Sequence, residues 1–206
     1  TRESDQILRD QVCAMIATGH ESTACALAWT LYIMATNPSA ARLVYSEVDE
    51  VLQRRVPAVG DIEKLSNIEM VFQEAMRLYP PVWTISRIAL ADDRTRDTDI
   101  PKGTTVMLSP YAVQRHPALW ENPEQFDPTR FTKEAIEQRH RYAYFPFGGG
   151  PRVCLGNRFA MLEAKVILAM IAQRYRLSVE PDQGIEAEPM ITLRPRNGIH
   201  VRQIGR

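Results

Sequence analysis

The ten residues 147–156, F-G-G-G-P-R-V-C-L-G, constrain the fold and chemistry of this 206-residue chain more than any other segment. They place Cys154 after a glycine-rich loop and directly before a helical pattern over residues 157–174. A thiolate at a helix N-terminus is stabilised by the helix dipole and by free backbone N–H groups. The segment therefore predicts a metal-ligating sulfur. The alternative is a buried cysteine in a glycine-rich turn.

The neighbours of Cys154 suit a flat partner that carries a negative charge. The three glycines of residues 148–150 allow a close approach of the backbone, because no Cβ stands in the way. Arg152 is placed to reach an anionic group, and Phe147 to cover the sulfur with an aromatic face.

With its pattern F-x-x-G-x-R-x-C-x-G, the chain resembles the cytochrome P-450 monooxygenases from end to end. The resemblance implies that haem b (iron protoporphyrin IX) binds at Phe147, Gly150, Arg152, Cys154 and Gly156, with Cys154 as the proximal thiolate ligand of the iron. It implies a mainly α fold with small β-sheets. Residues 1–206 would form its C-terminal, haem-binding part, and the N-terminal half of the family fold has no counterpart in the chain.

A second motif, T-G-H-E-S-T at residues 18–23, lies inside a long helical pattern. Gly19 costs a helix about 1 kcal/mol relative to alanine, so its presence needs a reason. The resemblance implies that this segment crosses the distal haem face, where the helix is locally widened. Glu21 then matches the acidic position and Ser22 the hydroxyl position, with Thr23 as the alternative hydroxyl. Small residues at a helix crossing are the other explanation.

A third motif places Glu74 and Arg77 three residues apart on one helical face, and Arg130 lies in the segment F-D-P-T-R-F. Taken alone, the first two are an ordinary surface pair of little energetic value. The resemblance implies that all three residues join to hold the meander beneath the haem. Their implied role is structural.

The resemblance also implies contacts with the haem propionates and with substrate. Arg87 matches a position that often binds a propionate, although a solvated strand residue is the alternative. The implied substrate contacts are mainly apolar and would otherwise be core residues: Ala17, Thr18, Val82, Trp83, Thr84, Met190 and Ile191.

Charge and composition limit the classes of partner and the cellular compartment to be expected. Lys and Arg total 25 and Asp and Glu total 25, which gives no reason to expect a nucleic-acid partner. Three cysteines leave no complete set of disulfides and favour a reducing, cytoplasmic compartment, although an N-terminal anchor is also compatible with the resemblance. Residues 12–35 are apolar enough to span a bilayer, but Glu21 at their centre favours a buried helix over a membrane span.

The local patterns predict these elements in chain order: a helix over residues 5–37, a second from Asn37-Pro38 to about Gln53, a turn over 57–61, a helix from a Ser66–Glu69 capping box to Pro80, strands over 82–90 and 104–109, a short helix within 110–120, a meander over 121–150, a helix over 157–174, and a hairpin of 191–193 with 199–204 around Asn197-Gly198. The pattern is thus mainly helical.

The resemblance implies a monooxygenase that inserts one atom of O2 into a small hydrophobic substrate. Electrons would come from a separate donor such as a ferredoxin, a flavodoxin or a flavin reductase, for which Arg139, Arg141, Arg158 and Lys165 are a candidate basic face. A peroxide-driven hydroxylase is one alternative, disfavoured by the pair Glu21-Ser22. Members of the family are about twice as long as this chain. The other alternative is therefore an incomplete or inactive haem-binding fragment, and residues 1–206 alone are not expected to be a competent monooxygenase.

Overall fold

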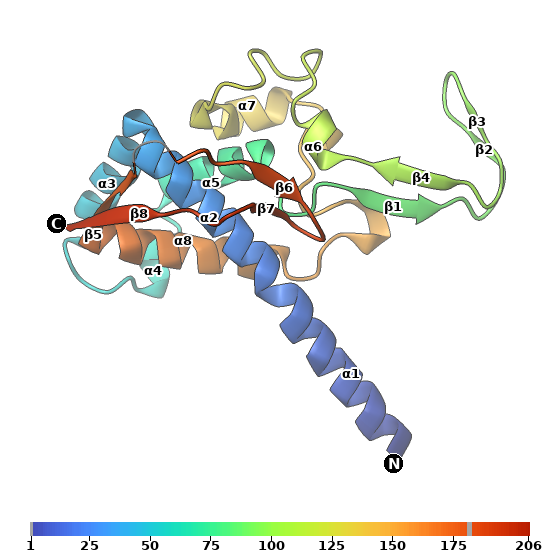
Figure 1. Ribbon diagram of the computed structural model, residues 1–206, viewed down its shortest axis with the longest axis horizontal. Helices are drawn as coiled ribbons and strands as arrows, with labels where there is room; N and C mark the ends of the chain where they lie inside the picture. Colours follow the sequence, from blue (N-terminus) through green and yellow to red (C-terminus); the bar gives the residue numbers. More distant parts are fainter. Residues whose placement is uncertain (1, 181–182) are drawn as a thin grey trace.

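The computed structural model describes residues 2–180 and 183–206, with side chains from residue 4 onward. Its helices are α1 (Arg2–Gly19), α2 (Glu21–Thr36), α3 (Pro38–Leu52), α4 (Val59–Ile62), α5 (Ser66–Leu78), α6 (Pro110–Val113), α7 (Lys133–Gln138) and α8 (Asn157–Arg174), with the short 3-10 helices η1 (Pro128–Phe131), η2 (Arg141–Ala143) and η3 (Gly150–Arg152). Its strands are β1 (Ile85–Ile88), β2 (Asp93–Arg94), β3 (Asp99–Ile100), β4 (Thr105–Leu108), β5 (Tyr175–Val179), β6 (Ala187–Pro189), β7 (Leu193–Pro195) and β8 (Val201–Gly205). The prediction of a mainly α chain with small β-sheets is confirmed (Figure 1).

Helices α2, α3, α5 and α8 pack around the main hydrophobic core. In α5 the apolar residues Ile68, Val71, Phe72 and Met76 recur every three or four positions and are almost fully buried, as expected for a helix with one face in the core. Small residues of α8, such as Ala164, Ala169 and Ala172, let its backbone approach the other helices closely. This core fixes α8, and with it the position of the cysteine loop that precedes α8.

The N-terminus of α5 is capped by a residue from another helix. The predicted capping box of Ser66 and Glu69 is wrong: α5 begins at Ser66 itself, and Glu69 pairs with Lys165 Nζ at 2.7 Å instead. The carboxylate of Glu47 in α3, only 6% exposed, accepts hydrogen bonds from the backbone N–H groups of Asn67 and Ile68 at 2.7 and 3.0 Å. A tertiary contact thus satisfies the first free donors of the helix.

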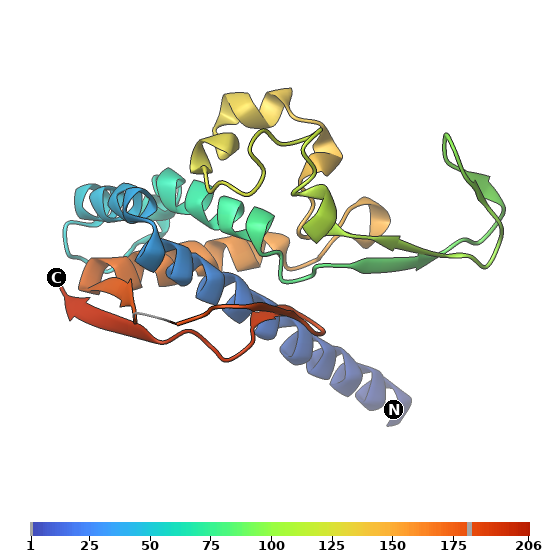
Figure 2. The same cartoon turned by 45° about the horizontal axis from the view of Figure 1, so that its top comes forward.

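The predicted single helix over residues 5–37 is divided at His20 into α1 and α2. Helix α1 extends away from the helical body in both views, and its apolar residues Ile7, Leu8, Met15 and Ile16 are exposed (Figures 1 and 2). Helix α2 is buried in the core from Thr23 onward. The division therefore separates an exposed rod from a packed helix. Asn37 ends α2 and caps α3, as predicted: its Oδ1 accepts from the backbone N–H groups of Ser39 and Ala40, in the first turn of α3, at 3.1 Å each.

The β-structure consists of antiparallel pairs. Strands β1 and β4 pair with Ile85 opposite Leu108, within the two predicted strand regions, and β2 pairs with β3, which was not predicted. The predicted C-terminal hairpin is wrong: β7 pairs with β6 and β8 pairs with β5, although Gly198 does form a turn with φ of 72°. The predicted turn over 57–61 contains most of the short helix α4, and α6 is the short helix predicted within residues 110–120.

Candidate functional site

The cysteine loop presents Cys154 to solvent just before α8. Cys154 is a free, exposed cysteine, and its backbone N–H donates to the carbonyl oxygen of Phe147 at 3.0 Å. Gly148, with φ of 74°, turns the chain between them and donates to the carbonyl oxygen of Phe145 at 2.9 Å. A side chain at this φ would be strained. Phe147 itself packs against the main core, which anchors the loop from beneath.

A cavity of about 440 Å³ adjoins this loop. Its lining comes from strands β1 and β4, from α6, from the segment before the loop and from the glycines: Ile85, Arg87, Leu108, Val113, Tyr142, Phe145, Gly148, Gly149 and Gly150. The structure thus brings Arg87 of β1 to the glycines of the cysteine loop. A Cβ at position 149 would lie 2.8 Å from Cε1 of Tyr142, so a larger residue there would displace the tyrosine ring.

The residues at this place fit an iron porphyrin. A thiol is a soft ligand suited to iron, and its sulfur is exposed at the start of the 18-residue helix α8. Arg87 and Arg152 are both exposed, and guanidinium groups form strong charge-assisted bonds with carboxylates such as propionates. Gly148, Gly149 and Gly150 line the cavity without side chains of their own.

The junction of α1 and α2 holds the predicted acid and hydroxyl residues. Ser22 Oγ donates to the carbonyl oxygen of Thr18 at 3.2 Å, and Thr23 Oγ1 donates to that of Gly19 at 3.3 Å. Thr23 is only 7% exposed, whereas Ser22 is half-buried and Glu21 is exposed. Of the two hydroxyl groups, the one on Ser22 is therefore the more accessible from the helix surface.

The break in the helix is compensated by side chains. At His20 the backbone leaves helical bonding, and Nδ1 of its ring lies 2.8 Å from the carbonyl oxygen of Ile16. The hydroxyls of Ser22 and Thr23 donate to the carbonyl oxygens of Thr18 and Gly19, also four residues back. The predicted local widening of the distal helix and the observed break fall at the same position.

Two of the three proposed substrate segments meet each other. The indole Nε1 of Trp83 donates to the carbonyl oxygen of Met190 at 2.9 Å and so joins the segment after α5 to the turn between β6 and β7. Met190 and Ile191 are 53% and 91% exposed on that turn. The remaining residues of the set lie on exposed or half-buried surface, namely Ala17 and Thr18 on α1, and Val82 and Thr84 before β1.

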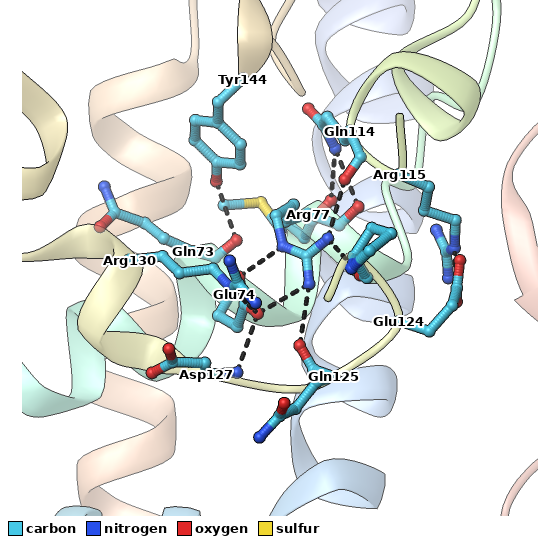
Figure 3. Close-up of polar contacts among 12 residues, drawn as sticks. Gln73, Glu74, Arg77, Gln114, Arg115, Glu124, Gln125, Asp127, Arg130 and Tyr144 are labelled. Atoms are coloured by element: carbon cyan, nitrogen blue, oxygen red, sulfur yellow. Dashed lines mark hydrogen bonds and ion pairs between the residues drawn. The ribbon is translucent and has the colours of Figure 1, made fainter. Parts of the chain in front are cut away.

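Glu74, Arg77 and Arg130 form a buried charge cluster between α5 and η1 (Figure 3). Arg77 donates through Nε and Nη2 to the two carboxylate oxygens of Glu74 at 2.7 and 2.8 Å, and both side chains are fully buried. Arg130 Nε lies 3.5 Å from Glu74 Oε1, and the N–H of Asp127 donates to the same oxygen at 2.9 Å. Burial raises the pKa of Glu74, although its hydrogen bonds to Arg77 oppose the rise.

Arg77 also binds the meander directly. Its Nη1 donates to the carbonyl oxygens of Gln114 and Pro123 at 2.8 and 2.7 Å, and its Nη2 to that of Gln125 at 3.1 Å (Figure 3). One guanidinium therefore uses all five of its donors, two on Glu74 and three on backbone carbonyl groups of two chain segments.

Gln114, which no sequence motif indicates, links α5 to the segment that precedes the cysteine loop. The side chain is fully buried, and its Nε2 donates to the carbonyl oxygens of Met76 and Arg77 at 3.1 Å each. Its Oε1 accepts from the backbone N–H of Phe145 at 3.0 Å. Tyr144, the neighbouring residue, donates from its hydroxyl to the carbonyl oxygen of Gln73 at 3.1 Å (Figure 3). Nothing in the local sequence distinguishes this glutamine from a solvated one.

The candidate basic face is smaller than predicted. Lys165 is buried and paired with Glu69, because α8 turns this residue toward α5. Arg139 stacks its guanidinium on the rings of Trp120 and Phe131, at 4.8 and 4.7 Å from their centroids. Arg141 and Arg158 are the exposed members of the set.

Comparison with known proteins decides the family. Residues 2–201 match the family model described as "Cytochrome P450". The chain belongs to the cytochrome P450 family. The resemblance inferred from the cysteine loop is thereby confirmed.

Several known proteins match nearly the whole chain. It is 40% identical over 190 residues to "Cyclooctatin synthase" of Streptomyces melanosporofaciens, covering 92% of this chain and 41% of that protein. It is 39% identical to "Putative cytochrome P450 132" of Mycobacterium tuberculosis, covering 98% and 43%. The chain therefore spans about two fifths of the length of these relatives.

A solved structure has the same fold. The crystal structure of the cytochrome P450DA heme domain superposes with a TM-score of 0.91 at 35% identity, covering 95% of this chain and 44% of that one.

Across residues 2–180 and 183–206, no helix is both long enough and apolar enough to cross a membrane.

Proposed function

We propose that this chain supplies the haem-binding part of a haem-thiolate monooxygenase, and that residues 1–206 are the C-terminal part of its cytochrome P450 domain. The observation that carries the proposal is the placement of Cys154. Its free, exposed thiol stands at the start of α8, beside a cavity that glycines of its own loop share with Arg87. Haem b is the proposed group, with Cys154 as its axial ligand and Arg87 and Arg152 as its propionate partners.

When bound, the haem iron would activate O2, so that two electrons and two protons accompany the transfer of one oxygen atom to a C–H or C=C bond and the release of the other as water. The residues of this chain supply the surroundings of that step. Cys154 donates electron density from its sulfur. Met190, Ile191, Trp83 and Val82 give substrate a mainly apolar wall, which suits a small hydrophobic compound.

The proton path is proposed to run through Glu21 and Ser22. Glu21 is exposed and able to exchange protons with solvent, and a hydroxyl such as that of the half-buried Ser22 can both accept and donate a hydrogen bond. This pair favours a reaction driven by O2 and electrons over one driven by peroxide. A separate ferredoxin, flavodoxin or flavin reductase is the proposed donor, and three free cysteines favour the cytoplasm.

Ser22→Ala should divert electrons from product to hydrogen peroxide. A positioned proton-transfer group contributes roughly 10²–10⁴-fold to a rate, so product per electron consumed should fall at least ~10-fold. Thr23→Ala is the matched control and should change this ratio much less, because the Thr23 hydroxyl is buried against Gly19. Peroxide and product are measured against electrons consumed. If Thr23→Ala instead lowered product per electron more than Ser22→Ala, the hydroxyl that serves the oxygen would be that of Thr23, one residue later than assigned.

The proposed activity is tested with ¹⁸O2. The full-length, haem-loaded protein is supplied with electrons by a ferredoxin and its reductase, and is incubated with a panel of small hydrophobic compounds. One labelled atom should appear in product and one in water. Oxygenation at the same rate with peroxide and no electron donor would instead identify a peroxide-driven hydroxylase.

A further inference from the structure

Thr192, which is buried, bonds the exposed Glu21 and ties the start of α2 to the C-terminal turn. The hydroxyl of Thr192 donates to Glu21 Oε1 at 2.8 Å, and the thiol of Cys25 lies 3.5 Å from the same hydroxyl oxygen. Thr192 is only 6% exposed, although it stands on the turn between β6 and β7. Three side chains from two ends of the chain thus form one short row.

The numbers of donors and acceptors in these three side chains determine the direction of their hydrogen bonds. A carboxylate only accepts hydrogen bonds, and a hydroxyl carries a single proton. The Thr192 proton therefore points to Glu21, and the oxygen of Thr192 accepts from the S–H of Cys25. The row runs from thiol to hydroxyl to carboxylate, and each of its hydrogen bonds supports the next.

The turn that carries Thr192 is fixed on both sides. Trp29 Nε1 of α2 donates to the carbonyl oxygen of Leu193 at 2.9 Å, and the N–H of Leu193 donates to the carbonyl oxygen of Pro81 at 2.9 Å. Trp83 Nε1 holds the carbonyl oxygen of Met190 at the other end of the turn. Thr192 therefore has little freedom to follow Glu21, so the threonine determines where the carboxylate lies.

We propose that Thr192 is a positioning residue for proton delivery: it holds Glu21 Oε1, so that Oε2 is the oxygen that takes a proton from solvent and passes it toward Ser22. This role rests on the proposed monooxygenase function. A glutamate released from this bond regains rotamer freedom and spends less time in the orientation needed for transfer. Thr192 touches neither substrate nor cofactor in this role, and acts through Glu21.

The test compares Thr192→Val with Glu21→Gln in the full-length, haem-loaded protein. Valine keeps the shape of threonine and removes the hydroxyl. When proton delivery fails, O2 leaves with two electrons and two protons as hydrogen peroxide. Thr192→Val should raise peroxide per electron consumed several-fold, as should Glu21→Gln, and the double variant should be no worse than Glu21→Gln. Thr192→Ser should restore the unmutated ratio.

A second readout is independent of turnover. The infrared S–H stretching band of Cys25, identified by subtraction of the Cys25→Ala spectrum, should shift to the frequency of a free thiol in Thr192→Val and stay in place in Thr192→Ser. Thr36→Val is the matched control, because the Thr36 hydroxyl bonds carbonyl groups of its own helix, at 2.9 and 3.4 Å, and should change neither readout. If Thr192→Val does not fold, Thr192→Ala carries the same test.

An unchanged peroxide ratio in Thr192→Val, or an unmoved S–H band, would overturn the role of Thr192 while leaving the monooxygenase proposal intact. An unmutated protein whose reduced carbon monoxide complex lacks the band of a thiolate-ligated haem would overturn the proposed function, and this role with it.

Discussion

Replacing Cys154 with histidine is expected to abolish the strongly red-shifted Soret band of the reduced carbon monoxide complex, even where haem remains bound. The band arises from the thiolate, which pushes electron density onto the iron, and an imidazole does not reproduce it. Cys154 is placed for this role by α8, whose N-terminus stabilises a thiolate, and by the turn at Gly148. The measurement is the difference spectrum of the full-length protein.

The matched control for this variant is Cys13→Ser. Cys13 is also free and exposed, but it stands on α1, far along the chain from the glycine loop. Its replacement should leave the band in place. A red-shifted band that survives in Cys154→His and disappears in Cys13→Ser would contradict the assignment of the ligand.

Replacing Glu74 with alanine is expected to cost about 3–5 kcal/mol of unfolding free energy, because it leaves the buried charge of Arg77 without its partner. Arg77 and Glu74 are both fully buried, and Arg130 is 14% exposed beside them. Stabilities of about 5–15 kcal/mol are usual, so this loss is a large share. Little haem-loaded protein should accumulate, as chemical denaturation and the haem absorbance per protein would show.

Glu124→Ala is the control for the charge cluster. Glu124 is 72% exposed and pairs with Arg115 at 3.2 Å, so its removal should cost no more than about 1 kcal/mol, as for surface pairs in general. Equal unfolding free energies for the two variants, with normal haem content in both, would show that Glu74 contributes no more to stability than an ordinary surface charge.

Features encoded by neighbouring residues were predictable from the sequence. The cysteine loop and the helix after it are recognisable because a glycine turn, the ligand and the helix start follow one another in the chain. The pair Glu74 and Arg77 was predictable because residues three apart share a helical face. Arg130 joined them only through the family resemblance, and the structure places it beside Glu74.

Features that depend on distant contacts were not predictable. Glu47 caps α5 from α3, Gln114 bonds Phe145 across 31 residues, and Thr192 reaches Glu21 across 171. The predicted C-terminal hairpin was wrong for the same reason. Its Asn197-Gly198 turn forms, but β8 finds a partner in β5, which directly follows α8. Periodicity and turn residues identify a strand without identifying the strand that pairs with it.

The central claim, that the sulfur of Cys154 binds the haem iron, is tested most directly by X-ray absorption at the iron edge of the full-length protein. The account predicts one sulfur neighbour of the iron in the unmutated protein, retained in Cys13→Ser and absent in Cys154→Ser. An iron surrounded by nitrogen and oxygen alone in the unmutated, haem-loaded protein would contradict it.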